Sequence, residues 1–206
     1  MTTPRVSIVF EGESDRAMAT KVIRYSGLGI DKVLSKGGAS RVDKLIPKLA
    51  KNTRLWNPWV VFRDSDTECP VELRRKLIGP ISPNPAFTLR IVHPMSEGWL
   101  MADQQSFSQY FEIPEKKLPT DTESLPHAKR FLLDLCGKYS SRDICSDIVR
   151  SDGSTGPLYA FRINDFARNH WDIESAARNS PSLNRALVSL ERMRSFLLSK
   201  DEKSSS

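Results

Sequence analysis

The stretch Arg5-Val6-Ser7-Ile8-Val9-Phe10-Glu11-Gly12-Glu13-Ser14-Asp15 decides the fold class of this chain. Residues 5–10 are mainly β-branched or apolar, which is typical of a buried strand. Glu11-Gly12 ends the strand in a turn, and Ser14 or Asp15 then caps a helix that runs to about Tyr25. The sequence therefore predicts a strand, an acidic turn and a helix at its N-terminal end.

The same alternation continues to about residue 112. A weak strand over 30–34 ends at Gly37-Gly38, and a helix over 40–51 follows it. The apolar strand Trp59-Val60-Val61-Phe62 runs into Arg63-Asp64-Ser65-Asp66, and the next elements are a helix over 71–77, a strand over 87–92 and a helix over 96–102. Strands that alternate with helices predict an α/β fold, with a mostly parallel, Rossmann-like sheet flanked by helices.

The pattern changes in the C-terminal half. Pro114, Pro119 and Pro126 interrupt a polar stretch, and helices are predicted over 127–138 and 182–198. We therefore expect an α/β core over 1–112, a mainly helical extension over 113–198 packed on that core, and a disordered tail over 199–206.

Composition sets broad limits on function. The net charge of +6 over 206 residues suits a polyanionic partner, without requiring one. No apolar run approaches the roughly 18 residues of a membrane span, so we expect a cytoplasmic protein that does not contact a membrane. Three scattered cysteines are typical of reduced thiols, and the histidines show no zinc-ligand spacing with them.

Acidic residues follow three of the predicted strands. Glu11 follows the first, Asp64 and Asp66 end the third, and Glu97 comes shortly after the fourth. The carboxyl ends of parallel strands meet at one edge of a sheet, where ligands collect. Carboxylate oxygens without imidazole or thiolate select Mg²⁺ or Mn²⁺. Because alternate residues of a strand share a face, Asp64 and Asp66 are expected to reach the same cation.

Two of these segments resemble the TOPRIM fold. Residues 6–15 resemble its opening strand followed by E-G-x-x-D, and residues 59–66 resemble its second motif, an apolar strand that ends in D-x-D. The resemblance covers about the first half of the chain. The fold occurs in topoisomerases, bacterial primases, small recombination proteins and OLD-family nucleases.

A narrower resemblance concerns Arg90–Asp103, which contains the segment Glu97-Gly98-Trp99-Leu100-Met101-Ala102-Asp103. It is similar to an uncharacterised TOPRIM-related family with an E-x-W-L-x-A-D segment, which often accompanies ATPases in bacterial anti-phage loci. The similarity extends more weakly to residues 171–182. It implies a partner ATPase and the role of a toxic effector in antiviral defence.

The resemblance also implies roles for individual residues. Glu11 would be a metal ligand or general acid/base, Asp64 and Asp66 would be metal ligands, Asp15 would support the metal site together with Glu13, and Glu97 would be a further catalytic acid. The implied activity is that of a Mg²⁺-dependent endonuclease, with Mn²⁺ as a possible substitute, acting on DNA, tRNA or other RNA. The number of metal ions and any homo-oligomeric state stay open.

Basic residues near the same edge are candidates for binding nucleic acid. Lys36 and Arg41 flank the turn after the second strand, Lys44 lies on the following helix, and Arg63 adjoins Asp64. His93 is either a general base or, as we expect, a hydrogen-bonded loop histidine. The four tryptophans are expected in the core rather than as platforms for bases: Trp56, Trp59, Trp99 and Trp171.

Other protein classes share single features of this sequence. A haloacid-dehalogenase phosphatase also uses D-x-D, but Glu68 occupies the place of its usual Thr or Val. The chain contains no phosphate-binding P-loop motif, and none of its four tyrosines has the context of a topoisomerase nucleophile. The rival from another class is a non-catalytic TOPRIM-like module that binds a partner ATPase.

Overall fold

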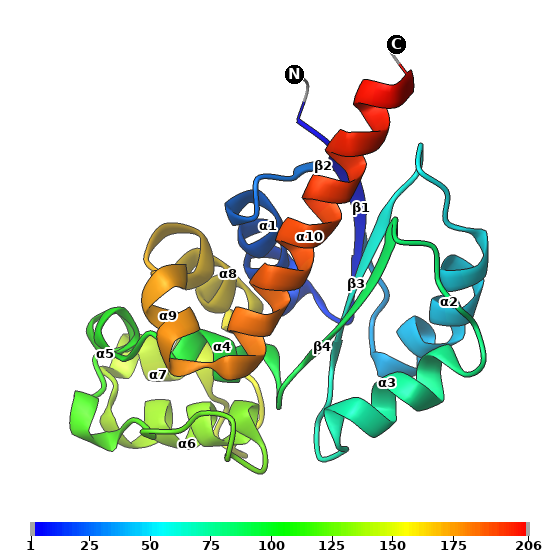
Figure 1. The fold of residues 1–206 in the computed structure, drawn as a ribbon. Coiled ribbons are helices and arrows are strands. Elements are labelled where there is room, and N and C mark those ends of the chain that lie inside the picture. Colours follow the sequence, from blue (N-terminus) through cyan, green and yellow to red (C-terminus); the bar gives the residue numbers. More distant parts are fainter. Residues whose placement is uncertain (1–2, 205–206) are drawn as a thin grey trace.

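The computed structural model describes residues 3–204 and the side chains of residues 3–200. It contains a four-stranded sheet in the order β2-β1-β3-β4, and every pair of neighbours is parallel. The strands are β1 (Arg5–Phe10), β2 (Gly29–Ser35), β3 (Trp59–Asp64) and β4 (Phe87–Val92). The predicted α/β class with a parallel sheet is therefore confirmed (Figure 1).

Helices cover both faces of the sheet (Figure 1). The short helix η1 (Glu13–Asp15) leads into α1 (Arg16–Tyr25) on one face, while α2 (Ala39–Asn52) and α3 (Pro70–Ile78) cover the other. Successive strand residues alternate between two cores: Ile8 and Val60 face α1, and Val9 and Val61 face α2 and α3. Because both faces are buried, β1 and β3 have continuous apolar sequences rather than alternating ones.

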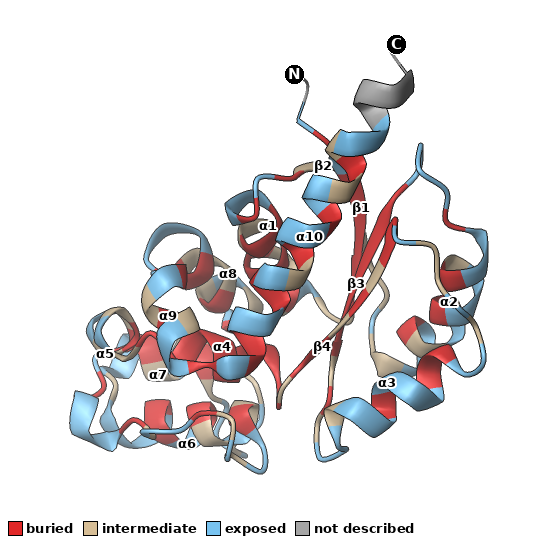
Figure 2. Cartoon of the chain, viewed as in Figure 1, coloured by how far each residue is buried: buried red, intermediate tan, exposed pale blue. Residues whose placement is uncertain are grey.

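The remaining helices gather on the face that carries α1 (Figure 1). They are α4 (Ser96–Met101), α5 (Gln104–Phe111), η2 (Glu115–Lys117), α6 (Ala128–Tyr139), α7 (Arg142–Ile148), α8 (Tyr159–Asn169), α9 (Ile173–Asn179) and α10 (Pro181–Ser204). The buried faces of these helices join the strands in one hydrophobic core, so the mainly helical C-terminal part packs directly on the sheet (Figure 2). None of the helices described is long and apolar enough to cross a membrane.

Two features differ from the sequence prediction. The last helix continues to Ser204, beyond the predicted end at Leu198, so residues 199–204 are helical rather than a disordered tail. The rest of that predicted tail, residues 205–206, lies outside the described residues. Trp59, Trp99 and Trp171 are buried as predicted, but Trp56 is 83% exposed. Trp56 lies in a turn closed by pairing of Arg54 with Asn57, so its side chain projects away from the core.

Candidate active site

The topology brings the acidic end of β1 against the acidic end of β3. After β1 the chain forms β2 at one edge of the sheet, beside β1. It then crosses back and forms β3 on the other side of β1. Such a reversal opens a crevice between the carboxyl ends of the two strands, where α/β proteins bind ligands. Here the Asp64 amide donates a hydrogen bond to Oε1 of Glu11 at 3.0 Å. The two predicted acids therefore lie at the same edge.

Two glycines fix the turn that carries Glu11. The amides of Gly37 and Gly38 both donate to the Glu11 carbonyl, at 2.7 and 2.9 Å. Gly37 has φ of 71° and Gly38 of 123°, values that L side chains rarely adopt. The Gly37-Gly38 turn predicted from the sequence thus closes one wall of the site and leads into α2.

Five carboxylates line a single pocket of about 330 Å³ at this edge (Glu11, Asp15, Asp64, Asp66 and Glu97). They come from the ends of β1 and β3, from η1 and from α4. All five were selected from the sequence, and the structure brings all of them together. Asp64 and Asp66 both line the pocket, although Asp66 lies beyond the end of β3 with φ of 52°. That the two aspartates share one cation stays a prediction.

The buried Arg63 guanidinium pairs with carboxylates at this edge and compensates part of their negative charge. Its Nη1 lies 3.1 Å from Oε1 of Glu11 and 3.2 Å from Oδ2 of Asp66, and its Nε lies 2.8 Å from Oδ1 of Asp43. Only 6% of the Arg63 side chain is exposed. The role predicted for Arg63 in nucleic-acid binding is therefore corrected: its guanidinium is buried among carboxylates and faces no solvent from which a phosphate would approach.

Asp15 and Glu97 form a buried wall of the pocket. Ser96 Oγ donates to Oδ1 of Asp15 at 2.7 Å and lies 3.5 Å from Oε2 of Glu97. The Gly12 amide donates to the other Asp15 oxygen at 2.9 Å. Burial raises the pKa of Asp15, and the negative charge of Glu97 raises it further. These contacts orient both carboxylates before any ligand binds.

Three residues of the C-terminal helices complete the site and were not selected from the sequence. The buried Tyr159 hydroxyl donates to Oε1 of Glu97, and Lys129 Nζ lies 3.7 Å from the same oxygen. Lys129 also lies over the Tyr159 ring, 4.8 Å from its centroid, and His127 lines the pocket beside it. Tyr159 had no distinguishing sequence context, because only tertiary packing brings α8 to this edge.

Burial and repulsion between neighbouring carboxylates raise the pKa of Asp64 and of Glu11. The pKa of Asp64 is raised well above its ordinary value by burial first, and then by the charges of Asp15, Glu97, Glu11 and Asp66. Burial also raises the pKa of Glu11, although the Arg63 guanidinium partly offsets this. Each raised pKa reports a cost of holding negative charge at this place. A divalent cation would relieve that cost.

The donor set fits a hard cation in kind, since all five acids offer carboxylate oxygens. Their present arrangement does not: within the part of the chain described, no three His, Cys, Asp or Glu side chains are placed to hold a metal ion together. The ion pairs explain this, because Arg63 holds Glu11 and Asp66 while Tyr159 and Lys129 hold Glu97. Metal binding therefore requires some of these side chains to exchange partners.

The other predicted residues do not line this pocket. Arg41 and Lys44 are exposed on α2, and Lys36 is half-buried in the turn before it. The Arg41 guanidinium donates to the Lys36 carbonyl at 3.3 Å. His93 is a hydrogen-bonded loop histidine, as expected, with Nδ1 2.7 Å from Ser65 Oγ. No family model, curated protein or solved structure matches the chain.

Proposed function

We propose that the chain is a metal-dependent nuclease that hydrolyses phosphodiester bonds of DNA or RNA, tRNA included. The carrying observation is the convergence of five strand-end and helix-end carboxylates on one pocket at the reversal point of a parallel sheet. Mg²⁺, or Mn²⁺, is the cation that such donors select. When bound, it would polarise the phosphoryl group and make water a better nucleophile.

The chain's own residues divide the remaining work. Asp64 lies at the centre of the cluster, where the other four acids all raise its pKa. Glu11 is partly exposed and burial raises its pKa, properties that suit a group accepting a proton from water. Asp15 and Glu97 are held in place by Ser96 and Tyr159, so they would offer fixed carboxylate oxygens to a cation, and the cation would attract the reacting phosphate.

The test combines metal binding with cleavage. Mg²⁺ and Mn²⁺ binding is measured by calorimetry, and labelled duplex DNA, single-stranded DNA and tRNA are then incubated with each metal. The proposal expects cleavage that EDTA stops, that Asp64→Asn abolishes and that Glu72→Gln, an exposed acid on α3, leaves unchanged. Metal binding without cleavage of any of these substrates would contradict it, as would cleavage by the Asp64→Asn variant.

A second candidate function is favoured by the Arg63 ion pairs. The Arg63 guanidinium pairs with Glu11 and Asp66, so part of the negative charge is compensated without metal. A non-catalytic module that docks on a partner ATPase would need such compensation. The same calorimetry separates the two candidates, because the module predicts no binding of either metal. The ATPase partner and the anti-phage effector role implied by the sequence resemblance are compatible with both candidates.

A further inference from the structure

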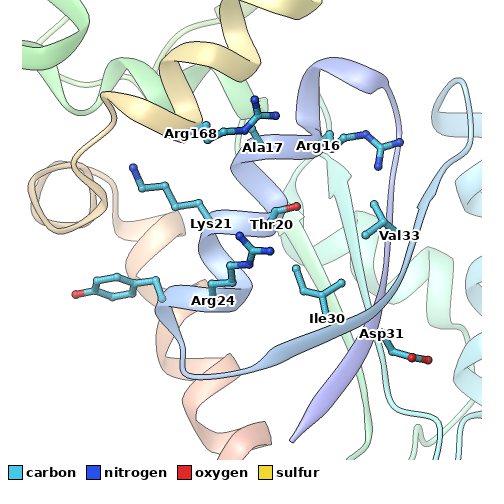
Figure 3. Close-up of a pocket in the computed structure, with 10 residues that line it drawn as sticks. Arg16, Ala17, Thr20, Lys21, Arg24, Ile30, Asp31, Val33 and Arg168 are labelled. Carbon is cyan, nitrogen blue, oxygen red and sulfur yellow. The ribbon is translucent and has the colours of Figure 1, made fainter. Parts of the chain in front are cut away.

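A second hollow lies against α1 and is larger than the acidic pocket, at about 630 Å³. Its walls are α1, the edge strand β2 and the last turn of α8, and its floor includes Ala17, Ile30 and Val33 (Figure 3). Its charged lining groups are four cations and one acid: Arg16, Lys21, Arg24, Arg168 and Asp31. We call this hollow the basic groove.

Helical spacing and one tertiary contact place these cations together. Arg16 and Arg24 are two turns apart and therefore lie on one face of α1. Arg168 reaches the groove because α8 is tied to α1 through Asn164. The Asn164 side-chain oxygen accepts from the Ala17 amide at 2.7 Å, and its Nδ2 donates to the Glu13 carbonyl, also at 2.7 Å. Figure 3 shows Arg16, Arg24 and Arg168 around the same open space.

Part of this positive charge is not ion-paired within the described part of the chain. Arg16 is held by Glu13, with its Nε 2.8 Å from a carboxylate oxygen, and Lys21 donates to the Trp171 carbonyl. Among the described residues, neither Arg24 nor Arg168 has a carboxylate within ion-pair distance. Available guanidinium groups above an apolar floor suit a strand with charged phosphates and apolar base faces.

The linings of the acidic pocket and the basic groove are adjacent in the chain, since Asp15 lines the first and Arg16 the second. Arg16 follows directly on Asp15, and its partner Glu13 belongs to the same short helix, η1. From Arg16 to Arg24 the groove extends about 12 Å along α1. We propose that the basic groove binds the phosphate backbone of the nucleic-acid strand whose scissile bond enters the acidic pocket. The second half of this statement rests on the proposed nuclease function, whereas binding in the groove does not.

The test uses the full chain carrying Asp64→Asn, so that no substrate is cleaved. Affinities for a 20-nucleotide single-stranded DNA and an RNA of the same sequence are measured by fluorescence anisotropy across a salt series. Arg24→Gln with Arg168→Gln should weaken binding to both. It should also lower the slope of log affinity against log salt by about 1.4, since each single-strand phosphate contact contributes about 0.7. Arg75→Gln with Arg142→Gln, two exposed arginines on α3 and α7, is the control of equal charge.

Each outcome decides the proposal. A loss of affinity and slope confined to the groove variant supports it, even if the wild type cleaves nothing and the nuclease function fails. The proposal is overturned if the groove variant binds as tightly as the parent chain, or if the control variant loses as much affinity as the groove variant. It is also overturned if the parent chain does not bind the oligonucleotides. Pyrophosphate is titrated in parallel: if it binds the groove and the oligonucleotide does not displace it, the groove serves a small anion and the strand proposal fails. Unchanged melting temperatures verify folding.

Discussion

Replacing Arg63 by Gln is the most direct perturbation of the acidic cluster. The buried guanidinium contacts Glu11, Asp43 and Asp66, so its removal leaves three carboxylates without their cation. Breaking a buried ion pair from one side costs roughly 3–5 kcal/mol. For a chain of this size each kcal/mol corresponds to about 2–4 °C. We therefore expect the melting temperature in EDTA to fall by roughly 6–20 °C.

Metal should reverse much of this loss, because the released acids would be free to bind it. At a concentration one hundred times the dissociation constant, a bound ligand contributes about 2.7 kcal/mol to the free energy of unfolding. The wild type should gain less, since its metal must compete with Arg63 for Glu11 and Asp66. Differential scanning calorimetry with EDTA, Mg²⁺ and Mn²⁺ measures the comparison. Arg63→Lys keeps a positive charge, so its melting temperature in EDTA should fall less than that of Arg63→Gln. It also provides a folded variant if Arg63→Gln does not fold.

Arg162→Gln is the matched control. Arg162 contacts Asp147 at 2.6 Å, away from the acidic pocket and partly exposed, so its loss should cost only about 1 kcal/mol or less, with no rescue by metal. The reasoning is refuted if Arg63→Gln melts within a few degrees of the wild type in EDTA. It is also refuted if Mg²⁺ raises the melting temperature of Arg63→Gln no more than that of the wild type.

Three further perturbations test the cluster and its surroundings. Burial and neighbouring charges raise the pKa of Asp64, so the protonated carboxyl contributes stability below the unfolded pKa of about 3.9, and this contribution is lost as pH rises through the folded pKa. In EDTA, Asp64→Asn should therefore stabilise the chain at pH 7.5 and much less at pH 5. An equal gain at both pH values in thermal melts would contradict this. Tyr159→Phe removes a hydrogen bond to the buried Glu97 carboxylate and should cost about 1.5–3 kcal/mol in denaturant unfolding, whereas no loss would mean that the contact is incidental. Arg41→Gln with Lys44→Gln should weaken nucleic-acid binding and lower its salt slope by about 1.4; the wild-type slope would show that α2 is only a solvated face.

The sheet was predictable because its two central strands, β1 and β3, are buried on both faces and therefore have continuous apolar sequences. The strand over 87–92 has the predicted bounds, and the predicted run over 59–62 continues in the structure only to Asp64. Once four parallel strands are accepted, the rule that their carboxyl ends share an edge places Glu11 and Asp64 at the same edge. That the two residues are neighbours follows only from the strand order, in which β1 and β3 are adjacent. The helices α5, α7, α8 and α9 were not predicted individually. With seven or eight residues each, α5, α7 and α9 give little helical periodicity, and Gly153, Gly156 and Pro157 obscure the start of α8.

The partners of the acids were less predictable. Tyr159 and Lys129 reach Glu97 from helices distant in the sequence, so only the packing of the C-terminal half reveals them. Arg63 did carry a signal. It is a charged residue inside the strand Trp59–Asp64, whose other residues are apolar up to Asp64. A cation placed in a strand buried on both faces requires carboxylates around it, and that requirement points to a structural role rather than to phosphate binding.

The charge balance of the cluster favours a ligand over a purely structural role. A structural ion-pair network is stable when its buried charges are matched, since each unpaired buried charge costs several kcal/mol. Here the five carboxylates of the pocket are contacted by Arg63 and Lys129, and Arg63 also serves Asp43. The raised pKa values of Asp15, Asp64 and Glu11 report the remaining excess of negative charge. Arg63 and Lys129 leave an excess of negative charge that either bound protons or a further cation would offset, and the metal-dependent chemistry proposed for this edge requires the cation.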